Sequence, residues 1–563
     1  MRAAVRIILG ALIVACALAS LTSNAQPQPA NNLVYEIFVR SFADGDNDAA
    51  GNGDLKGIVD RLDTYLNDGN PATDTDLEVG VLWLMPIFPS MTYHGYDVTD
   101  FRNVNPEYGT LADFRALAAQ AHRRGVRIIL DIPFNHTSSE HPWFREAIAD
   151  PSSPRRRFFH IKPGPAPSVQ AGQKRVWHDV TSPSGEPLQY LGVFDPHMPD
   201  LNFENADVRR EVEAIARFWL TLGADGFRLD AAKHLYGEQS DPSEDDTLKN
   251  NAWWRQFSRA MYDASPKALL VGEVLGDRES LRRYAWGLDA LLDEPFMNEV
   301  RTSVAGPTEG LLGREKQFLE QARGLNDVGG SSEPTPPRFE SFAFVASHDR
   351  DPRLASDIED FKARGMSYSV DEGYRLALYL LLSLPSHPVV YAGDELMQRG
   401  RKSGQPDYDK TLREPFPWYA SGQGVGQTRW FQPRYDAAND GVSREEQGQP
   451  GRMLHLARAL TNLRTRHPGF ANGDIGAIAS DSRDWMVFER VSADERYMVL
   501  INRSLEGRNY RFHEAWFPQY RGARLIFWSD GRQATWKDTT SDNQNIDDSV
   551  FVPPVGLVLL RQR

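Results

Sequence analysis

Short apolar, β-branched runs alternate with amphipathic helical patterns along most of the chain, and this alternation limits the possible folds most strongly. Eight runs have the length of buried strands: Val34–Phe42, Val79–Phe88, Val126–Phe134, Ala224–Ala231, Leu269–Leu275, Ala290–Phe296, Phe342–Asp349 and Pro388–Leu396. The helical patterns include Leu111–Arg124, Ala206–Leu222, Ala252–Ala264, Glu372–Leu384 and Met453–His467. Strands that alternate with helices pair in parallel, and eight such units favour an α/β fold with a closed (β/α)8 TIM barrel over an open sheet.

Two regions depart from the alternation. Residues 137–199, between the third and fourth strands, are irregular and rich in Pro, Arg and His, which predicts an inserted subdomain (domain B). Beyond residue 469 the helical period gives way to short alternating runs, which predict a C-terminal all-β sandwich over 470–563. The barrel would then comprise 32–136 and 200–469, and a chain of 563 residues is long enough for these domains.

The N-terminus predicts a signal peptide over residues 1–25. Arginines flank its start, an apolar run follows, and Ser23-Asn24-Ala25 offers a small-residue cleavage site. We therefore expect an exported protein, extracellular or periplasmic. Cys16, the one cysteine of the chain, lies in this segment. Residues 13–16 resemble a lipoprotein box, so Cys16 is either a lipid anchor or part of a peptide that is removed.

The charge of the chain limits its partners. A net charge of −14 argues against nucleic acid or an anionic membrane surface as the main partner. The 13 tryptophans and 19 tyrosines suit flat, hydroxyl-rich ligands such as sugars, although most aromatic side chains of any protein belong to its core. We expect a monomer.

Ionisable side chains cluster where several predicted strands end. They are Asn135-His136 after strand three, Arg228 and Asp230 on strand four, Glu273 on strand five and His348-Asp349 on strand seven. Because alternate residues of a strand share a face, Arg228 and Asp230 should lie side by side. The carboxyl ends of barrel strands meet at one face, so the whole set should converge.

Three converging carboxyl groups are what a retaining glycosidase needs. One attacks the anomeric carbon, one protonates the leaving oxygen, and a third can stabilise the oxocarbenium-like charge. Arg228 would keep the neighbouring Asp230 ionised. Any one of these pairs alone is more typical of a salt bridge or a helix cap, but four groups at matching strand ends indicate an active site.

Seven motifs in order then resemble the α-amylase family, glycoside hydrolase family 13, from about Val34 to the end of the chain. They are Gly80–Pro86, Asp131–His136, Met198–Asn202, Gly226–His234, Gly272-Glu273-Val274, Phe344–Asp349 and Gly393-Asp394-Glu395. The resemblance implies the barrel, the inserted domain B and the C-terminal β-sandwich predicted above.

The resemblance also implies roles for individual residues. Asp230 matches the nucleophile, Glu273 the general acid/base and Asp349 the transition-state stabiliser. The substrate-binding residues that it implies are Tyr96, His136, Arg228, Lys233, His234 and His348. One departure is Ser347, where the family usually has Asn; in chloride-dependent amylases that Asn helps to hold the anion, so chloride activation is not expected.

An aspartate-rich loop follows the first strand. Asp44, Asp46 and Asp48 alternate, and Asn52 and Asp54 close the loop, a hard-oxygen set that Ca²⁺ prefers. The loop resembles the family's calcium loop, with two extra residues before Asn52; the alternative is a solvated acidic turn. A second Ca²⁺, held as in many amylases by Asn135, Asp200 and the His234 carbonyl, is a further hypothesis.

These observations predict a secreted α-amylase that cleaves internal α-1,4 bonds of starch-like glucans and maltooligosaccharides. Relatives that close the cleft for exo-cleavage typically carry an acidic residue where this chain has Tyr93, whose aromatic ring would instead leave the cleft open to a further glucose. The alternative is an exo-acting α-glucosidase or transglycosylase on short oligosaccharides. A non-catalytic relative is disfavoured because all three carboxyl residues are present.

Overall fold

The computed structural model describes residues 32–562 except 169–175, 237–245, 289, 307, 328–338, 437, 513–517, 521, 532–533 and 537–548. The predicted signal peptide and Cys16 lie outside the described residues. Among the described helices, none has the length and apolar character needed to cross a membrane.

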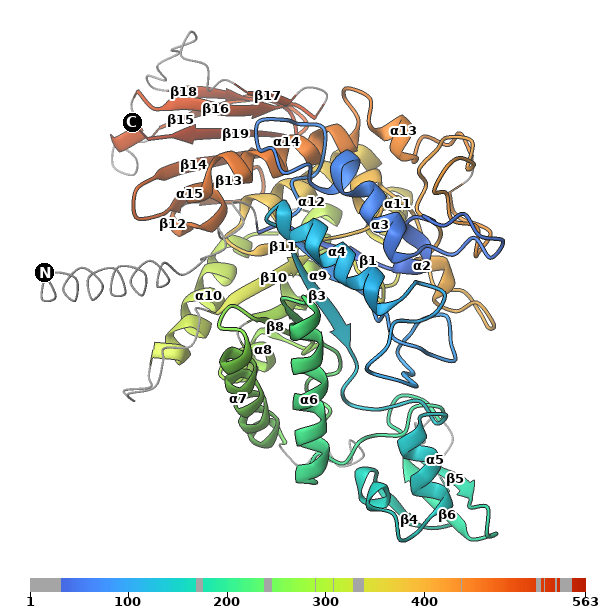
Figure 1. Cartoon of the computed structure of the whole chain (residues 1–563). Coiled ribbons are helices and arrows are strands. Elements are labelled where there is room, and N and C mark those ends of the chain that lie inside the picture. Colours follow the sequence, from blue (N-terminus) through green and yellow to red (C-terminus); the bar gives the residue numbers. More distant parts are fainter. Residues whose placement is uncertain are drawn as a thin grey trace, which may run out of the picture.

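Eight parallel strands close into a barrel, which confirms the predicted fold (Figure 1). In order around the barrel they are β1 (Val34–Ile37), β2 (Val81–Leu84), β3 (Arg127–Ile132), β7 (Gly226–Leu229), β8 (Leu269–Gly272), β9 (Ala290–Asp293), β10 (Glu340–Phe344) and β11 (His387–Tyr391). The helices after the strands are α2 (Val39–Phe42), α3 (Leu55–Arg61), α4 (Leu111–Arg123), α6 (Ala206–Leu222), α7 (Thr247–Ala264), α8 (Arg278–Tyr284), α9 (Glu294–Ala305), α10 (Leu311–Asp327), α11 (Leu354–Ala363), α12 (Val370–Ser383), α13 (Arg444–Gln447), α14 (Met453–Arg466) and α15 (Pro468–Asn472).

Helix α6 illustrates why these segments become helices. Its buried residues recur every three or four positions, as Val208, Val212, Ile215, Ala216, Trp219 and Leu222. Asn205 caps the first turn by accepting a hydrogen bond from the amide of Asp207, and Gly223 ends the helix at a φ of 113°. One apolar stripe therefore packs on the barrel, and both ends satisfy their backbone groups.

The inside of the barrel has an apolar layer that ends in a polar one. The apolar layer consists of Val34, Val81, Trp83, Ile129, Leu269, Val271, Ala290, Leu292, Met297, Phe342, Phe344 and Val389. Two residues beyond Val34 and Ile129, on the same strand faces, come the fully buried Glu36 and Asp131. Charged groups thus replace apolar ones at the carboxyl end of the barrel, where the functional side chains gather.

The strands are shorter than the apolar runs predicted. β1 ends at Ile37, and residues 39–42 form helix α2 instead of extending the strand. β10 ends at Phe344, so His348 and Asp349 lie in an irregular loop rather than at the strand end itself. An apolar run indicates that a segment is buried, but not that it is a strand. Because the segments that leave the barrel mouth are buried as well, hydrophobicity alone does not show where a strand ends.

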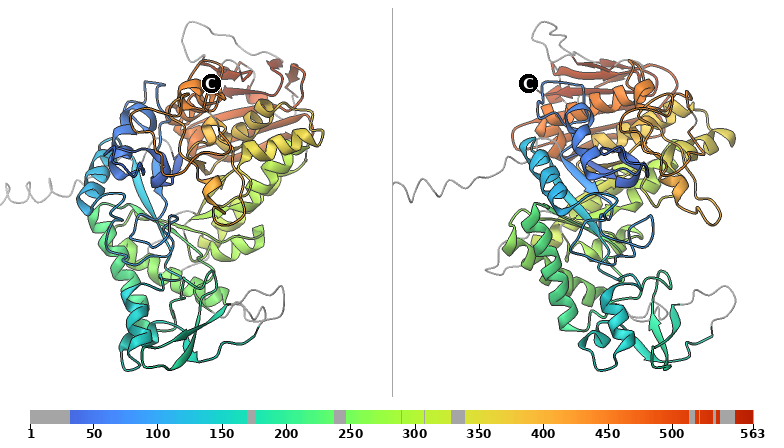
Figure 2. Two further views of the ribbon diagram at one scale, coloured as in Figure 1. Left: turned by 90° about the vertical axis from the view of Figure 1, so that its right-hand side faces the viewer. Right: turned by 45° about the vertical axis from the view of Figure 1, so that its right-hand side comes forward.

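The inserted region is more regular than its sequence indicates. It contains α5 (Pro142–Ala149), a 3-10 turn (Pro154–Phe158) and an antiparallel sheet of β4 (Ile161–Pro163), β6 (Pro187–Leu191) and β5 (Trp177–Thr181). These strands are short and mix buried with exposed positions without a regular alternation, which is why the apolar pattern did not show them. In Figure 2 this part projects from one end of the barrel.

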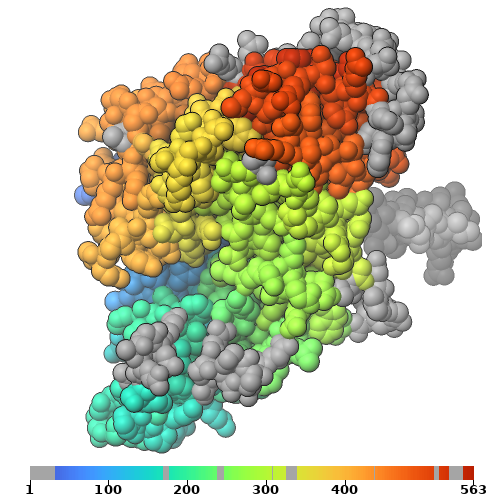
Figure 3. Space-filling view, turned by 180° about the vertical axis from the view of Figure 1, so that it is seen from behind, coloured from blue at the N-terminus to red at the C-terminus, as the bar shows by residue number. Residues whose placement is uncertain are grey.

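The C-terminal domain packs on the opposite end (Figure 3). Its antiparallel sheet has the order β12 (Asp474–Asp481), β13 (Trp485–Val491), β14 (Arg496–Asn502), β19 (Gly556–Arg561), β16 (Arg524–Ser529) and β17 (Ala534–Trp536). A second sheet pairs β15 (Arg508–Arg511) with β18 (Ser549–Val552), and residues of both sheets share one core. The buried Arg503 joins this domain to the barrel by donating to the carbonyls of Ser303 and Thr308.

Candidate active site

A single buried arginine, Arg228 on β7, collects three carboxylates at the mouth of the barrel. Its Nη1 lies 2.8 Å from Oδ1 of Asp131 and 2.6 Å from Oδ1 of Asp230, and its Nη2 lies 2.6 Å from Oε1 of Glu273. The arginine side chain is 1% exposed. Three carboxyl groups thus share one guanidinium, an arrangement that proteins rarely bury without a functional reason.

The register between neighbouring strands brings these charged groups together. Asp131 and Arg228 are paired neighbours on β3 and β7, while Asp230 and Glu273 directly follow β7 and β8. The next residue, Ala231, has a φ of 50°, uncommon for a residue other than glycine, and its amide donates to Oε2 of Glu273 at 3.0 Å. The turn after β7 therefore carries Asp230 and also holds the carboxylate of Glu273 in place through the Ala231 amide.

Asp230 and Glu273, two of the three carboxyl groups beside Arg228, have raised pKa values. Burial raises the pKa of Asp230 to about 6, against the opposing effect of Arg228 and with a further contribution from Asp131. Burial, Asp230 and Asp349 also raise the pKa of Glu273, although Arg228 lowers it. A pKa of about 6 leaves Asp230 mainly ionised near neutral pH, and burial shifts Glu273 toward the protonated form that a general acid needs.

Asp349 differs from both because cations surround it. Its Oδ1 lies 2.7 Å from Nη2 of Arg413, and its Oδ2 lies 3.1 Å from Nε2 of His348. Burial opposes its charge, but His348, Arg413 and Arg228 hold the pKa of this carboxyl well below its usual range. Half of the side chain is exposed, so Asp349 presents its negative charge to solvent at the mouth of the barrel.

His348 and Tyr96 pack against each other beside this carboxylate. Their rings stack with centroids 5.7 Å apart and planes at 16°. The Tyr96 hydroxyl lies 2.7 Å from Nε2 of His348 and donates to Oδ2 of Asp131 at 3.0 Å. Trp83 also donates to Asp131, at 3.1 Å. The predicted residues Tyr96 and His348 therefore contact the carboxylate cluster.

His136 and Tyr93 lie further from the cluster. Nε2 of the buried His136 is 3.2 Å from the Tyr96 carbonyl, and burial lowers the pKa of His136 to about 4, so it is neutral. Tyr93 stacks on Trp430 at 5.8 Å and 20°, with Nζ of Lys410 5.4 Å from its ring centroid. These neighbours occupy part of the aromatic surface that the sequence predicted would stack on a sugar.

Lys233 and His234 follow the turn after β7. Nζ of Lys233 donates to the Leu275 carbonyl at 2.6 Å, which ties this turn to the loop after β8. The ring of His234 meets Phe194 of the inserted region edge to face at 5.3 Å. Phe194 also lies 5.5 Å from the ring of His136, so these residues line the boundary between barrel and insert.

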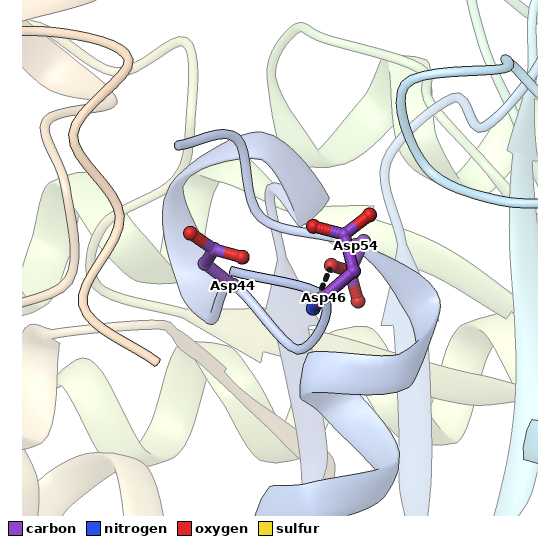
Figure 4. A group of neighbouring side chains, drawn as sticks. All are labelled: Asp44, Asp46 and Asp54. Carbon is purple, nitrogen blue, oxygen red and sulfur yellow. Dashed lines mark hydrogen bonds between the residues drawn. The ribbon is translucent and has the colours of Figure 1, made fainter. Parts of the chain in front are cut away.

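Of the five residues predicted in the aspartate-rich loop, the structure brings three together (Figure 4). Asp44, Asp46 and Asp54 each place a carboxylate oxygen within 4.8 Å of the others. Asp48 instead accepts from the amide of Gly51 at 2.9 Å, and the Asn52 side-chain oxygen accepts from Arg40 at 2.8 Å. In the second predicted set, the side-chain amide of Asn135 donates to Asp200 at 3.2 Å.

Four residues of the site received no predicted role: Glu36, Trp83, Asp131 and Arg413. Asp131 is the first residue of the motif Asp131–His136 and lies two residues beyond Ile129. The two-residue period of a strand could therefore have predicted that its side chain lies inside the barrel. Glu36 is a lone acid in an apolar strand, a signal of the same kind. Arg413 comes from an irregular segment after β11, and no periodicity marks it.

Comparison with known proteins agrees with this geometry. The α-amylase catalytic-domain family matches residues 36–473. Alpha-amylase 3 of Dictyoglomus thermophilum is 34% identical over 492 residues, 87% of this chain and 88% of that protein. An oligo-1,6-glucosidase of Parageobacillus thermoglucosidasius is 38% identical over 543 residues (84% and 90%), and a 4-alpha-glucanotransferase of Thermotoga neapolitana is 30% identical over 479 residues (84% and 95%).

Among solved structures, an α-amylase from H. orenii superimposes with a TM-score of 0.77 at 32% identity, covering 94% of this chain and 99% of that one. Fold, family match and full-length relatives agree with the carboxylate cluster at the barrel mouth. The chain belongs to the α-amylase family of glycoside hydrolases, glycoside hydrolase family 13.

Proposed function

We propose that this glycoside hydrolase cleaves internal α-1,4 bonds of starch-like glucans and maltooligosaccharides with retention of configuration. The observation that carries the proposal is that the three carboxyl groups have different surroundings. Asp230 and Glu273 both contact the guanidinium of Arg228, whereas His348 and Arg413 keep Asp349 ionised. A double displacement needs one ionised carboxylate, one protonated carboxyl group and a stable negative charge near the developing cation.

In the proposed mechanism, Asp230 attacks the anomeric carbon while Glu273 protonates the leaving oxygen. Both carboxyl groups contact Arg228, so they lie close together, as a covalent glycosyl-enzyme route requires. Glu273, now ionised, then takes a proton from water while the water oxygen attacks the anomeric carbon, and the bond between that carbon and Asp230 breaks to free the carboxylate. Asp349 stabilises the positive charge in both steps.

Internal cleavage is the finer part of the proposal. It is supported by Tyr93, an aromatic residue at the position where an exo-acting pocket is expected to carry a carboxylate, and by the relative named α-amylase. A particular observation favours the alternative of exo-cleavage or glycosyl transfer on short chains: similar relatives include an oligo-1,6-glucosidase and a 4-alpha-glucanotransferase.

The products of starch hydrolysis distinguish the two. For internal cleavage we expect viscosity and iodine staining to fall well before much reducing sugar appears. Each early cut shortens a long chain considerably but creates only one new reducing end. Maltose and short maltooligosaccharides should dominate the early products. Glucose as the sole early product, or maltose consumed faster than starch, would support the exo-acting alternative, and chains longer than the substrate would reveal transfer.

We propose Ca²⁺ as the ion of the aspartate-rich loop, held by Asp44, Asp46 and Asp54. Oδ2 of Asp44 is buried and accepts no hydrogen bond, and the nearby Arg429 lies 3.9 Å away. Burial raises the pKa values of Asp44 and Asp54, and the charge of Asp46 raises them further. A hard divalent cation would relieve this repulsion, and its role there would be structural.

Removal of the ion should therefore lower the melting temperature. A ligand that binds only the folded state stabilises it by mass action, so a chelator should shift the wild-type Tm downward and added Ca²⁺ should restore it. Asp46→Asn should abolish most of this response. It is a cleaner variant than one at Asp54, which also caps helix α3 through the Gly57 amide. A chelator-insensitive Tm in protein shown by metal analysis to be calcium-free would contradict the proposal.

Export completes the proposal. It rests on the charged start, apolar run and small-residue site within residues 1–25. Mass spectrometry of the mature protein would identify the new N-terminus and show whether Cys16 is removed or carries lipid.

A further inference from the structure

Behind the catalytic carboxylates, Glu36 makes a contact that the α-amylase comparison leaves unassigned. It lies on β1, where it is the paired neighbour of Trp83 on β2 and of Tyr391 on β11, and it is 0% exposed. Its Oε1 contacts Nδ1 of His348, from the loop after β10. Its Oε2 is buried without a hydrogen-bond partner. A buried carboxylate with one close partner favours a charged partner.

The surroundings of His348 require protons on both of its ring nitrogens. Nδ1 faces Glu36, while Nε2 lies 3.1 Å from Oδ2 of Asp349 and 2.7 Å from the Tyr96 hydroxyl. An ionised carboxylate can only accept hydrogen bonds, so a carboxylate at each nitrogen selects the doubly protonated imidazolium. The Tyr96 hydroxyl can donate to Asp131 at 3.0 Å, so it need not donate to His348.

The other groups around His348 do not replace Glu36. From β2, Trp83 presents its ring at 90° and 6.1 Å. Arg413, from the segment after β11, donates through Nε to the His348 backbone carbonyl at 3.1 Å. Asp131 on β3 acts through Tyr96. Burial alone would lower the pKa of His348, but Asp349 and Glu36 raise it to about 10.

We propose that Glu36 is a positioning residue that keeps His348 in its doubly protonated form, so that Nε2 remains a proton donor and the ring a positive charge beside Asp349 throughout the working pH range. The carboxylate of Glu36 thereby keeps His348, Tyr96 and Asp349 in one hydrogen-bonded arrangement. The consequence for catalysis rests on the proposed function, in which Asp349 stabilises the transition state. The protonation of His348 does not depend on it.

The variant that tests this is Glu36→Gln, which keeps the shape and an acceptor oxygen for Nδ1–H but removes the charge. Histidine-labelled protein would be followed by NMR, with the His348 signal assigned by its loss in His348→Gln. In the wild type, His348 should be an imidazolium at about pH 8. In Glu36→Gln its titration midpoint should fall by about one to three pH units, the usual effect of removing one close opposite charge.

Activity provides the second readout. On a maltooligosaccharide with a good leaving group, the ratio of the kcat of Glu36→Gln to that of the wild type should decline between about pH 6 and about pH 9, because His348 becomes neutral only in the variant. The matched control is Glu395→Gln, another fully buried glutamate, which bonds Tyr35 and Tyr65 instead of His348. It should leave the His348 titration unchanged.

A neutral His348 in the wild type at about pH 7 would overturn the proposal, as would an unchanged His348 titration in Glu36→Gln or a rate ratio independent of pH. If Glu36→Gln does not fold, the wild-type titration alone decides. Absence of α-glucan hydrolysis would refute the proposed function while leaving the NMR result on His348 intact.

Discussion

Asp230→Asn should lower kcat by roughly 10⁴- to 10⁶-fold, the loss typical when a catalytic nucleophile is removed. An amide cannot form the glycosyl-enzyme, but its oxygen can still accept from Nη1 of Arg228, which now lies 2.6 Å from Asp230. The fold should therefore survive, with a Tm near that of the wild type. Steady-state kinetics on a maltooligosaccharide with a good leaving group would measure the loss.

The matched control is Asp225→Asn, five residues earlier. Asp225 precedes β7, where it pairs with His122 at 2.8 Å and accepts from the Ile128 amide, away from the cleft. This change should reduce stability and leave kcat within about threefold of the wild type, as for positions outside an active site. If Asp230→Asn kept more than a few per cent of wild-type kcat, the nucleophile would have to be another group.

Arg228→Met should be the most destabilising change in the site, with an expected loss of about 3–5 kcal/mol near neutral pH. It leaves Asp131, Asp230 and Glu273 buried together without their shared cation. Activity should also fall by at least about 100-fold, because neither Asp230 nor Glu273 keeps its orientation.

The stability loss should depend on pH, with a sign that follows from the carboxyl groups. Without Arg228 their folded pKa values rise further above the unfolded values, so the folded variant binds extra protons and loses stability as pH increases. Urea unfolding at about pH 5 and about pH 8 should show the larger deficit at the higher pH. Arg228→Lys keeps one positive charge but lacks the two donor nitrogens of the guanidinium, so its loss of stability should lie between those of the wild type and Arg228→Met. An equal deficit at both pH values would mean that Arg228 does not balance these carboxylates.

Much of this site could be predicted from the sequence because strand geometry has a fixed period. The two-residue spacing of Arg228 and Asp230 correctly indicated that the two side chains meet. The same period places Asp131 in the barrel interior beyond Ile129. Its contact with Arg228, however, depends on the register between β3 and β7, which the sequence of either strand alone does not contain.

Contacts made by irregular segments could not be predicted in this way. Arg413 reaches Asp349 from a segment without periodicity, and Glu36 meets His348 across 312 residues of chain. In the aspartate-rich loop, composition indicated a cation site but not which oxygens face one another. Asn52 is turned toward Arg40 because a buried guanidinium needs an acceptor, a requirement that arises only in the folded protein.

The configuration of the first product tests the proposed double displacement most directly. Wild-type enzyme would be mixed with maltooligosaccharide, and proton NMR would follow the anomeric signals before mutarotation equilibrates them. Attack by Asp230 followed by attack of water inverts the anomeric carbon twice, so the α-anomer should appear first and the β-anomer only later. Initial release of the β-anomer would contradict the covalent route through Asp230 and would require Glu273 and Asp230 to act on opposite faces of the sugar with water between them.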